Sequence, residues 1–143
     1  MQSFFWHVLA DARVYASLQD EIQSAVKSGT IPPTGNISWN ESQQLPYFQA
    51  CLKEAMRVRP AVGLNITRRV PPEGAEVDGQ FFPGGVSIAV NGWVLHRDRP
   101  TFGNDADVYR PERWLQDPEE AKRMERYMFQ VNQYQNNNFV FSG

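Results

Sequence analysis

The chain has 143 residues, a formal net charge of −2 and a pI of about 5.7. Hydrophobic residues make up 41% of it and charged residues 21%, which is typical of a globular protein rather than a disordered one. The small negative net charge gives no electrostatic basis for nucleic-acid binding. No apolar run approaches the ~20 residues of a membrane-spanning helix. We therefore expect one globular unit without a nucleic-acid partner or a membrane segment.

The N-terminal part of the chain is predicted to be helical. Apolar residues recur at spacings of three and four over residues 4–28, as on one face of a helix. Glu21 is assigned to the opposite, polar face. Residues 30–40 are rich in Pro, Gly and Asn, which predicts a loop. Within it, Ser38 or Asn40 is a candidate N-cap for a short turn.

A further helix is predicted over residues 45–59. Glu54 and Arg57 lie three residues apart on this helix and share a face at the edge of its apolar stripe. Cys51 lies on the apolar arc, which predicts core packing rather than metal ligation. As the single cysteine, it also excludes an intramolecular disulfide. The stripe is predicted to contain Leu45, Phe48, Leu52 and Met56.

The remainder of the chain combines short strands with one more helix. Residues 61–91 alternate in the manner of half-buried strands, with predicted turns at residues 71–74 and 83–85. Residues 100–107 are predicted to form a loop. A helix with acidic residues in its first turn is predicted over residues 117–131. The predicted fold class is mainly α with a small β-sheet.

The pairing of Glu54 with two arginines is the main functional indication. Arg57 shares its helix face, and Arg113 comes from the proline-led segment Pro111–Trp114. Guanidinium groups bind a carboxylate through fork-like hydrogen bonds, so a buried triad would fix that segment to the helix. Removing one member would then cost about 3–5 kcal/mol. The alternative is a pair of unrelated surface ion pairs, each worth about 0.3–0.5 kcal/mol.

The residues around this pair resemble a known family. The order L-P-Y-x-x-A-x-x-K-E-A-x-R-x-x-P over residues 45–60 resembles the E-x-x-R helix of the cytochrome P-450 family, the haem-thiolate monooxygenases. Pro111–Trp114 resembles its P-E-R-F or P-E-R-W loop. The sequence of residues 71–74 and 81–85 is similar to that of fungal members of the pisatin-demethylase and benzoate-hydroxylase kind. The resemblance covers nearly the whole chain, which implies a partial cytochrome P-450 domain over residues 1–143.

The resemblance implies roles for individual residues. It makes the Glu54 triad structural, and it places Arg69 at a haem propionate, with Arg68 as the alternative if the strand register is shifted by one. It places His96 on the same side of the haem in a structural role. No catalytic residue is expected in this chain. The segment after the E-x-x-R helix is implied to line the substrate pocket, with residues Val62, Gly63, Leu64 and Asn65.

The axial ligand of the haem is not expected in this chain. In the family it is a cysteine thiolate that follows the P-E-R loop, so Cys51 is not that ligand. Phe141–Gly143 resembles the opening of the cysteine loop. We therefore expect a fragment that starts near the end of the distal helix, stops just before the ligand cysteine and is inactive by itself. The alternatives are a catalytically inactive truncated product with at most an interaction role, and separate chains that complement one another.

The resemblance also implies the chemistry of the parent enzyme. That parent would hold haem (iron protoporphyrin IX) and take electrons from NADPH through a reductase partner. It would use dioxygen to hydroxylate or demethylate a small organic substrate. The location implied for the parent is the endoplasmic-reticulum membrane.

Overall fold

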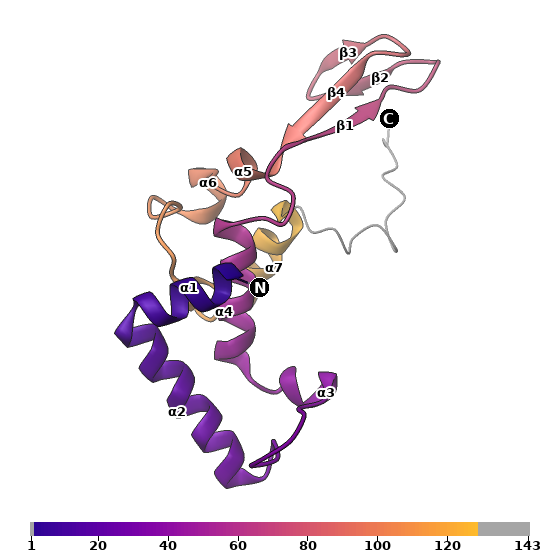
Figure 1. Ribbon diagram of the computed structural model, residues 1–143. Coiled ribbons are helices and arrows are strands. Elements are labelled where there is room, and N and C mark those ends of the chain that lie inside the picture. The colour runs from indigo at the N-terminus through magenta and orange to yellow at the C-terminus, as the bar shows by residue number, and fades with distance from the viewer. Residues whose placement is uncertain (1, 129–143) are drawn as a thin grey trace.

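The protein is described by a computed structural model, in which residues 2–128 are placed. Helices dominate, and the strands form two small antiparallel pairs, which confirms the predicted fold class (Figure 1). The helices are α1 (Gln2–Ala10), α2 (Ala12–Ser28), α3 (Trp39–Ser42), α4 (Pro46–Val58), α5 (Gly92–Leu95), α6 (Arg99–Phe102), the 3₁₀ helix η1 (Pro111–Trp114) and α7 (Pro118–Tyr127). The strands are β1 (Asn65–Arg69), β2 (Ala75–Val77), β3 (Gln80–Phe82) and β4 (Ser87–Asn91).

The N-terminal helical region is divided at Asp11. Its side chain accepts a hydrogen bond from the backbone N–H of Arg13 at 2.9 Å, which caps α2. Glu21, predicted on the polar face of this helical region, is half-buried and contacts the next long helix. Its carboxylate accepts the backbone N–H groups of Tyr47 at 2.7 Å and Phe48 at 2.9 Å. Glu21 thereby caps the start of α4, which has no side-chain cap of its own.

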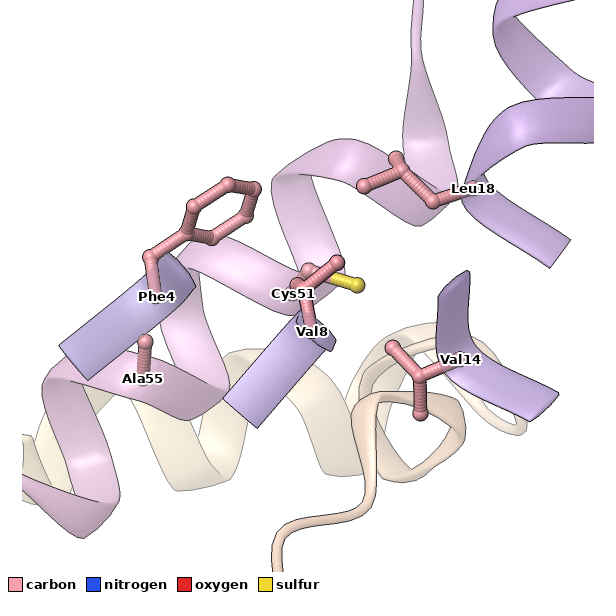
Figure 2. Close-up of a cluster of buried hydrophobic side chains, with 6 residues drawn as sticks. All are labelled: Phe4, Val8, Val14, Leu18, Cys51 and Ala55. Atoms are coloured by element: carbon pink, nitrogen blue, oxygen red, sulfur yellow. The ribbon is translucent and has the colours of Figure 1, made fainter. Parts of the chain in front are cut away.

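The core lies where α1 and α2 cross α4. Figure 2 shows Phe4 and Val8 of α1 and Val14 and Leu18 of α2 gathered around Cys51 and Ala55 of α4. The predicted core packing of Cys51 is confirmed, since its side chain is fully buried. The prediction for Met56 was wrong, because this side chain is 42% exposed. The buried face of α4 is rotated from the predicted apolar stripe so that it includes Glu54 and Arg57. Two charged side chains therefore lie on the buried face, where the pattern predicted apolar ones.

The strands form an arm that extends away from the helices (Figure 1). β1 pairs with β4, and β2 pairs with β3 as a separate hairpin. The strands therefore form two two-stranded sheets rather than the single small sheet that was predicted. The hairpin turns at Asp78 and Gly79, with φ values of 52° and 72°, as a two-residue turn of the I′ kind requires. The expected half-burial is not found, since most residues of β1 and β4 are exposed.

The C-terminal part agrees with the prediction at α7 and differs before it. Asp117 caps α7 through the backbone N–H of Glu119 at 2.9 Å. The predicted loop at residues 100–107 instead begins with a turn of helix, α6, capped by Asp98. Residues 129–131 of the predicted helix, and Phe141–Gly143, lie outside the described residues. Within residues 2–128, no helix combines the length and the apolar character needed to cross a bilayer.

Candidate functional site

The centre of the candidate site is the carboxylate of Glu54, which is fully buried on α4. Five N–H groups converge on its two oxygens. Oε1 accepts from Arg57 Nη2 at 2.8 Å, from Arg113 Nε at 2.9 Å and from the backbone N–H of Arg110 at 2.9 Å. Oε2 accepts from Arg57 Nε and from Trp114 Nε1, both at 2.9 Å. The carboxylate therefore has the full set of hydrogen bonds that a buried charge needs.

Arg57 connects this carboxylate to the chain that follows the strands. Its Nη1 donates to the carbonyl oxygens of His96 at 2.8 Å and Ala106 at 2.6 Å, and its Nη2 donates to that of Val108 at 3.1 Å. Its guanidinium carbon also lies 5.3 Å from the centre of the Phe102 ring. One fully buried side chain thus holds three separate points of the segment between α5 and η1.

Arg113 binds the same segment from the opposite side. Beyond Glu54, its Nη1 donates to the carbonyl oxygen of Phe102 and lies 3.2 Å from Asp105 Oδ1. Its Nη2 donates to the carbonyl oxygens of Asp105 at 3.1 Å and Val108 at 3.2 Å. A hydrogen bond from the Arg110 side chain, together with the charge of Arg113, holds the pKa of Asp105 below its usual range although burial opposes this.

The buried charges of the network are compensated by close partners. Arg57 and Arg113 carry two positive charges in the interior, Glu54 carries a buried negative charge between them, and the half-exposed Asp105 pairs with Arg113 and Arg110. Removing one partner of a buried, hydrogen-bonded pair leaves an uncompensated charge and costs about 3–5 kcal/mol. Surface pairs are worth a small fraction of this. The structure thus brings the three predicted triad residues together in the buried arrangement, and the alternative of two separate surface pairs does not apply.

Three members of the network were missed by sequence reasoning. Trp114 directly follows Arg113, and a buried indole N–H needs an acceptor, so its position beside the motif was an available signal. Arg110 contributes its backbone N–H to Glu54, which no residue type reveals. Asp105 lies in an irregular loop outside any motif, and only the fold brings it to Arg113.

His96 is buried next to the Glu54 network, at the backbone of Arg57. Its side chain is fully buried, and its Nδ1 lies 3.2 Å from the carbonyl oxygen of Arg57. Burial, together with the nearby Arg57 charge, lowers the pKa of His96 despite the opposing backbone contact. The ring therefore packs at the C-terminal end of α4. A position on the propionate side of a haem stays a prediction.

Arg69 lies on the arm, away from the Glu54 network. In the β1–β4 pair, Arg69 is opposite Ser87 and Arg68 is opposite Ile88. Both arginines are exposed, and the Arg69 guanidinium passes within 3.7 Å of the Cβ position of Gly85. Its predicted role as a propionate contact stays a prediction.

The predicted substrate-pocket segment connects α4 to the arm. Leu64 is 79% exposed and Val62 is 38% exposed, while Gly63 is half-buried and Asn65 is exposed. Backbone packing is tight at the base of this segment, because a Cβ at Gly92 would lie 3.0 Å from the Val62 carbonyl oxygen. An apolar side chain as exposed as Leu64 is suited to contact a further apolar surface.

The single cysteine and the two histidines do not form a metal site. Burial raises the pKa of Cys51 to about 12, and the Cys51 backbone carbonyl accepts a hydrogen bond from the Tyr109 hydroxyl at 3.0 Å. His7 stacks on the Tyr109 ring with centroids 4.4 Å apart. Among residues 2–128, no group of three or more His, Cys, Asp or Glu side chains could hold a metal ion.

Comparison with known proteins places the whole arrangement in a family. The cytochrome P450 family model matches residues 1–129, which is most of the chain. The chain belongs to the cytochrome P450 family. The Glu54 network is thus the buried polar centre of a P450 chain, and the fungal character indicated by the sequence is confirmed by its relatives.

Three relatives illustrate the match. The cytochrome P450 monooxygenase cicH of Emericella nidulans is 41% identical over 124 residues, which cover 87% of this chain and 24% of the relative. A pisatin demethylase of Fusarium vanettenii is 41% identical over 116 residues, covering 81% of this chain and 21% of the relative. A cytochrome P450 monooxygenase of Aspergillus flavus is 52% identical over 88 residues, covering 62% and 17%. The chain spans about a quarter or less of the length of these relatives.

Proposed function

We propose that this chain is the part of a fungal haem-thiolate monooxygenase that fixes the region beneath the haem. The parent enzyme would insert one atom of dioxygen into a small organic substrate and reduce the other to water. The two electrons would come from NADPH through a reductase partner. The observation that carries the proposal is the fully buried Glu54 carboxylate, which binds Arg57 and Arg113 within a P450 sequence.

The network suits a supporting role rather than a catalytic one. All of its charges are directed at one another or at backbone carbonyl groups, so none is available to a substrate. Its geometry fixes the segment from His96 to Trp114 on α4 through carbonyl groups that are far apart in the chain. A rigid supporting layer of this kind maintains the position of a cofactor held above it.

The described residues fit the edge of a haem but supply no axial ligand. Arg69 presents an exposed guanidinium, which is the group that binds a propionate in a bidentate manner. Leu64 and Val62, just before the start of β1, present exposed apolar side chains. Cys51 does not fit an axial role, since its thiol is buried between α1, α2 and α4 with its pKa raised to about 12. When bound, a thiolate-ligated haem iron supplies the oxygen activation.

The type of substrate is proposed from the relatives. One of them is named for the demethylation of pisatin. A demethylation or hydroxylation of a small organic compound is therefore proposed here, and the exposed apolar segment at residues 62–65 is suited to line an apolar pocket.

The test begins with the transcript that flanks the codons for residues 1 and 143. A contiguous frame that supplies a downstream cysteine loop should yield a protein that binds haem, with the spectrum of a thiolate ligand when reduced and exposed to carbon monoxide. It should also consume NADPH in the presence of a reductase and form an oxidised product. Absence of haem binding in the longest contiguous protein would contradict the proposal.

A matched pair of arginine variants tests the assignment of the propionate contact. Arg69→Gln in the haem-containing protein should lose haem more readily to an apoprotein acceptor, whereas Arg68→Gln should retain it as the unaltered protein does. The two residues are adjacent on β1 and both are exposed, so their general effects on the strand are comparable. Equal retention by the two variants would remove the propionate role from Arg69.

A second candidate concerns the chain by itself. Several large apolar side chains on α1 and the arm are strongly exposed, among them Trp6 and Phe81. Exposed apolar surface of this kind favours association with another protein surface. A catalytically inactive product with an interaction role is supported if the transcript ends at Gly143 and the purified chain associates with a separately expressed remainder of a P450.

A further inference from the structure

The turn that carries Arg113 also has a carboxylate of its own, Glu112, which is half-buried. Arg113 of η1 points into the Glu54 network, whereas the preceding Glu112 reaches toward α2 and the start of α4. Its Oε1 accepts a hydrogen bond from the Tyr47 hydroxyl at 3.0 Å and forms an ion pair with Arg13. Three chain segments separated by 99 residues at the extremes therefore meet at one oxygen atom.

Tyr47 is held at both of its ends. Its hydroxyl binds Glu112, and its backbone N–H binds Glu21 Oε1 at 2.7 Å. Arg13 and Glu21 both belong to α2 and lie about two helical turns apart. One end of α2 thus supplies a cation to Glu112, and its middle supplies a carboxylate to the N-terminus of α4. These two contacts fix the axial position of α2 against Tyr47.

The electrostatics agree with this geometry. Burial alone would raise the pKa of Glu112, yet its pKa lies below the usual range. The backbone N–H of the residue, the Tyr47 hydroxyl and the Arg13 guanidinium together stabilise the carboxylate. The charge of Glu112 also contributes to raising the pKa of the Cys51 thiol, after burial, which is the main cause. The charged form of Glu112 is therefore the one that the structure binds.

We propose that Glu112 is a second clamp, a positioning residue that ties the first turns of α2 and α4 to η1 and thereby holds Arg113 in register with Glu54. This role is independent of haem and of the proposed function. It distinguishes two adjacent residues of the P-E-R segment: Arg113 binds the buried Glu54 carboxylate, and Glu112 binds Arg13 of α2 and Tyr47 of α4.

A double-mutant cycle in the complete 143-residue chain tests the clamp. Glu112→Gln and Tyr47→Phe should each raise the unfolding equilibrium constant by about two- to tenfold, measured by circular dichroism in urea. The double variant should raise it by clearly less than the product of the two single effects, because the second substitution removes a contact already lost. Additive single effects would overturn the proposal, as would a wild-type chain that shows no cooperative unfolding transition.

The exposed pair of Lys122 and Glu119 on α7 supplies the matched control. Lys122 Nζ and Glu119 Oε1 lie 2.8 Å apart, which is hydrogen-bond distance, but both side chains are exposed. The Lys122→Gln and Glu119→Gln cycle should show effects that add within error. Coupling as large as that between Glu112 and Tyr47 would overturn the assignment of a special clamp.

A spectroscopic measurement separates positioning from general packing. The side-chain carboxyl carbon of Glu112, followed by NMR during an acid titration, should report a low pKa in the unaltered chain. Tyr47→Phe and Arg13→Gln should each move that pKa upward, because each removes a group that stabilises the carboxylate. A Glu112 pKa that stays unchanged in both variants would overturn the proposal even if their stabilities fell.

Discussion

The helical hub and the β arm of this chain are built on opposite principles. The hub comprises α1, α2, α4 and η1 around Glu54, and it contains a buried carboxylate with five hydrogen-bond donors. The arm, residues 65–91, consists of two two-stranded pairs, and its large apolar side chains, such as Phe81 at 65% exposure, face outward. Figure 1 shows the arm extending away from the helices.

The difference indicates where each region obtains its stability. The central charges of the hub, Glu54, Arg57 and Arg113, are hydrogen-bonded to partners within the described chain. Isolated two-stranded sheets are marginally stable in water, and they need a further layer against which to pack. The arm and the adjoining Leu64 are therefore prepared for contacts beyond residues 2–128, as a chain that spans about a quarter of its relatives would require.

The largest expected effect comes from breaking the hub at its centre. Glu54→Gln removes the negative charge that, among residues 2–128, contacts both buried arginines, and it directs an amide N–H toward N–H donors. We expect a loss of about 3–5 kcal/mol in the free energy of unfolding, measured by urea denaturation. This is a large share of the roughly 5–15 kcal/mol of a typical domain, so the helical signal itself should fall.

The control for this change is Glu119→Gln on α7. Its carboxylate forms an exposed ion pair with Lys122, and removal should cost no more than about 0.5 kcal/mol. Similar losses for Glu54→Gln and Glu119→Gln would show that the buried network does not stabilise the hub as the geometry indicates.

A change confined to the arm should leave the hub intact. A Cβ at Gly84 would lie 2.3 Å from the Pro72 carbonyl oxygen and 2.8 Å from that of Pro71, so Gly84→Ala must displace the backbone there. We expect a local cost of about 1–3 kcal/mol. Amide hydrogen exchange should accelerate at Val70 and Gly85, whose N–H groups bond across the end of the β1–β4 pair that is farther from the helices, while the urea midpoint of the hub stays unchanged.

Gly63→Ala is the neutral counterpart of this change. The nearest atom to a Cβ at Gly63 is Pro60 Cγ at 3.9 Å, which is ordinary contact. Exchange at Val70 and Gly85 should therefore remain as in the unaltered chain. If Gly84→Ala accelerated exchange at Val70 and Gly85 and also lowered the urea midpoint of the hub, the two regions would unfold as one unit. The contrast between the hub and the arm would then be wrong.

Sequence reasoning predicted the hub better than the arm for physical reasons. The pairing of Glu54 with Arg57 and Arg113 was predictable because the surrounding residues resemble the E-x-x-R helix and the P-E-R loop of a known family, whereas the spacing alone left two separate surface pairs open. The same reasoning misplaced Met56, since apolar periodicity assumes that charged residues face solvent, and here two of them occupy the buried face.

Other features depended on contacts that no local pattern encodes. Periodicity placed Glu21 on the polar face of its helix but could not show that the fold brings this face to the start of α4, which has no side-chain cap of its own. Asp105 joins the network through an irregular loop. The two-residue turn at Asp78 and Gly79 was different, since an Asp-Gly pair between apolar residues is a recognisable hairpin signal that was overlooked.

A smaller effect should follow from the outer edge of the network. Asp105 is half-exposed and lies 3.2 Å from Arg113 Nη1 and 2.5 Å from Arg110 Nε. Because water screens the pair and can replace it, Asp105→Asn should cost about 0.5–1 kcal/mol, as measured by urea denaturation. Asp107→Asn is the control, because Asp107 is 63% exposed and its arginine contacts are at 3.4 and 3.8 Å. A loss for Asp105→Asn that equals the loss for Glu54→Gln would mean that burial does not set the strength of these pairs.

The smallest expected effect is a pH dependence of the hub through His96. Its folded-state pKa lies below the ordinary value of 6.5, mainly because the ring is buried and also because Arg57 is close. The folded state therefore prefers the neutral ring, while the unfolded chain takes up a proton more readily. Stability should be fully present above about pH 6.5 and should decline as the pH falls from there toward the folded-state pKa.

This effect is measured as the difference in urea midpoint between about pH 7.5 and pH 5.5. In His96→Gln the difference should shrink, since the titrating ring is gone. His7→Gln is the matched control: the pKa of His7 is also lowered by burial, but its ring is less buried and stacks on Tyr109, so a smaller part of the dependence should disappear. If His7→Gln removed more of the pH dependence than His96→Gln, the acid sensitivity would belong to the contact between α1 and the Tyr109 loop rather than to the layer behind the Glu54 network.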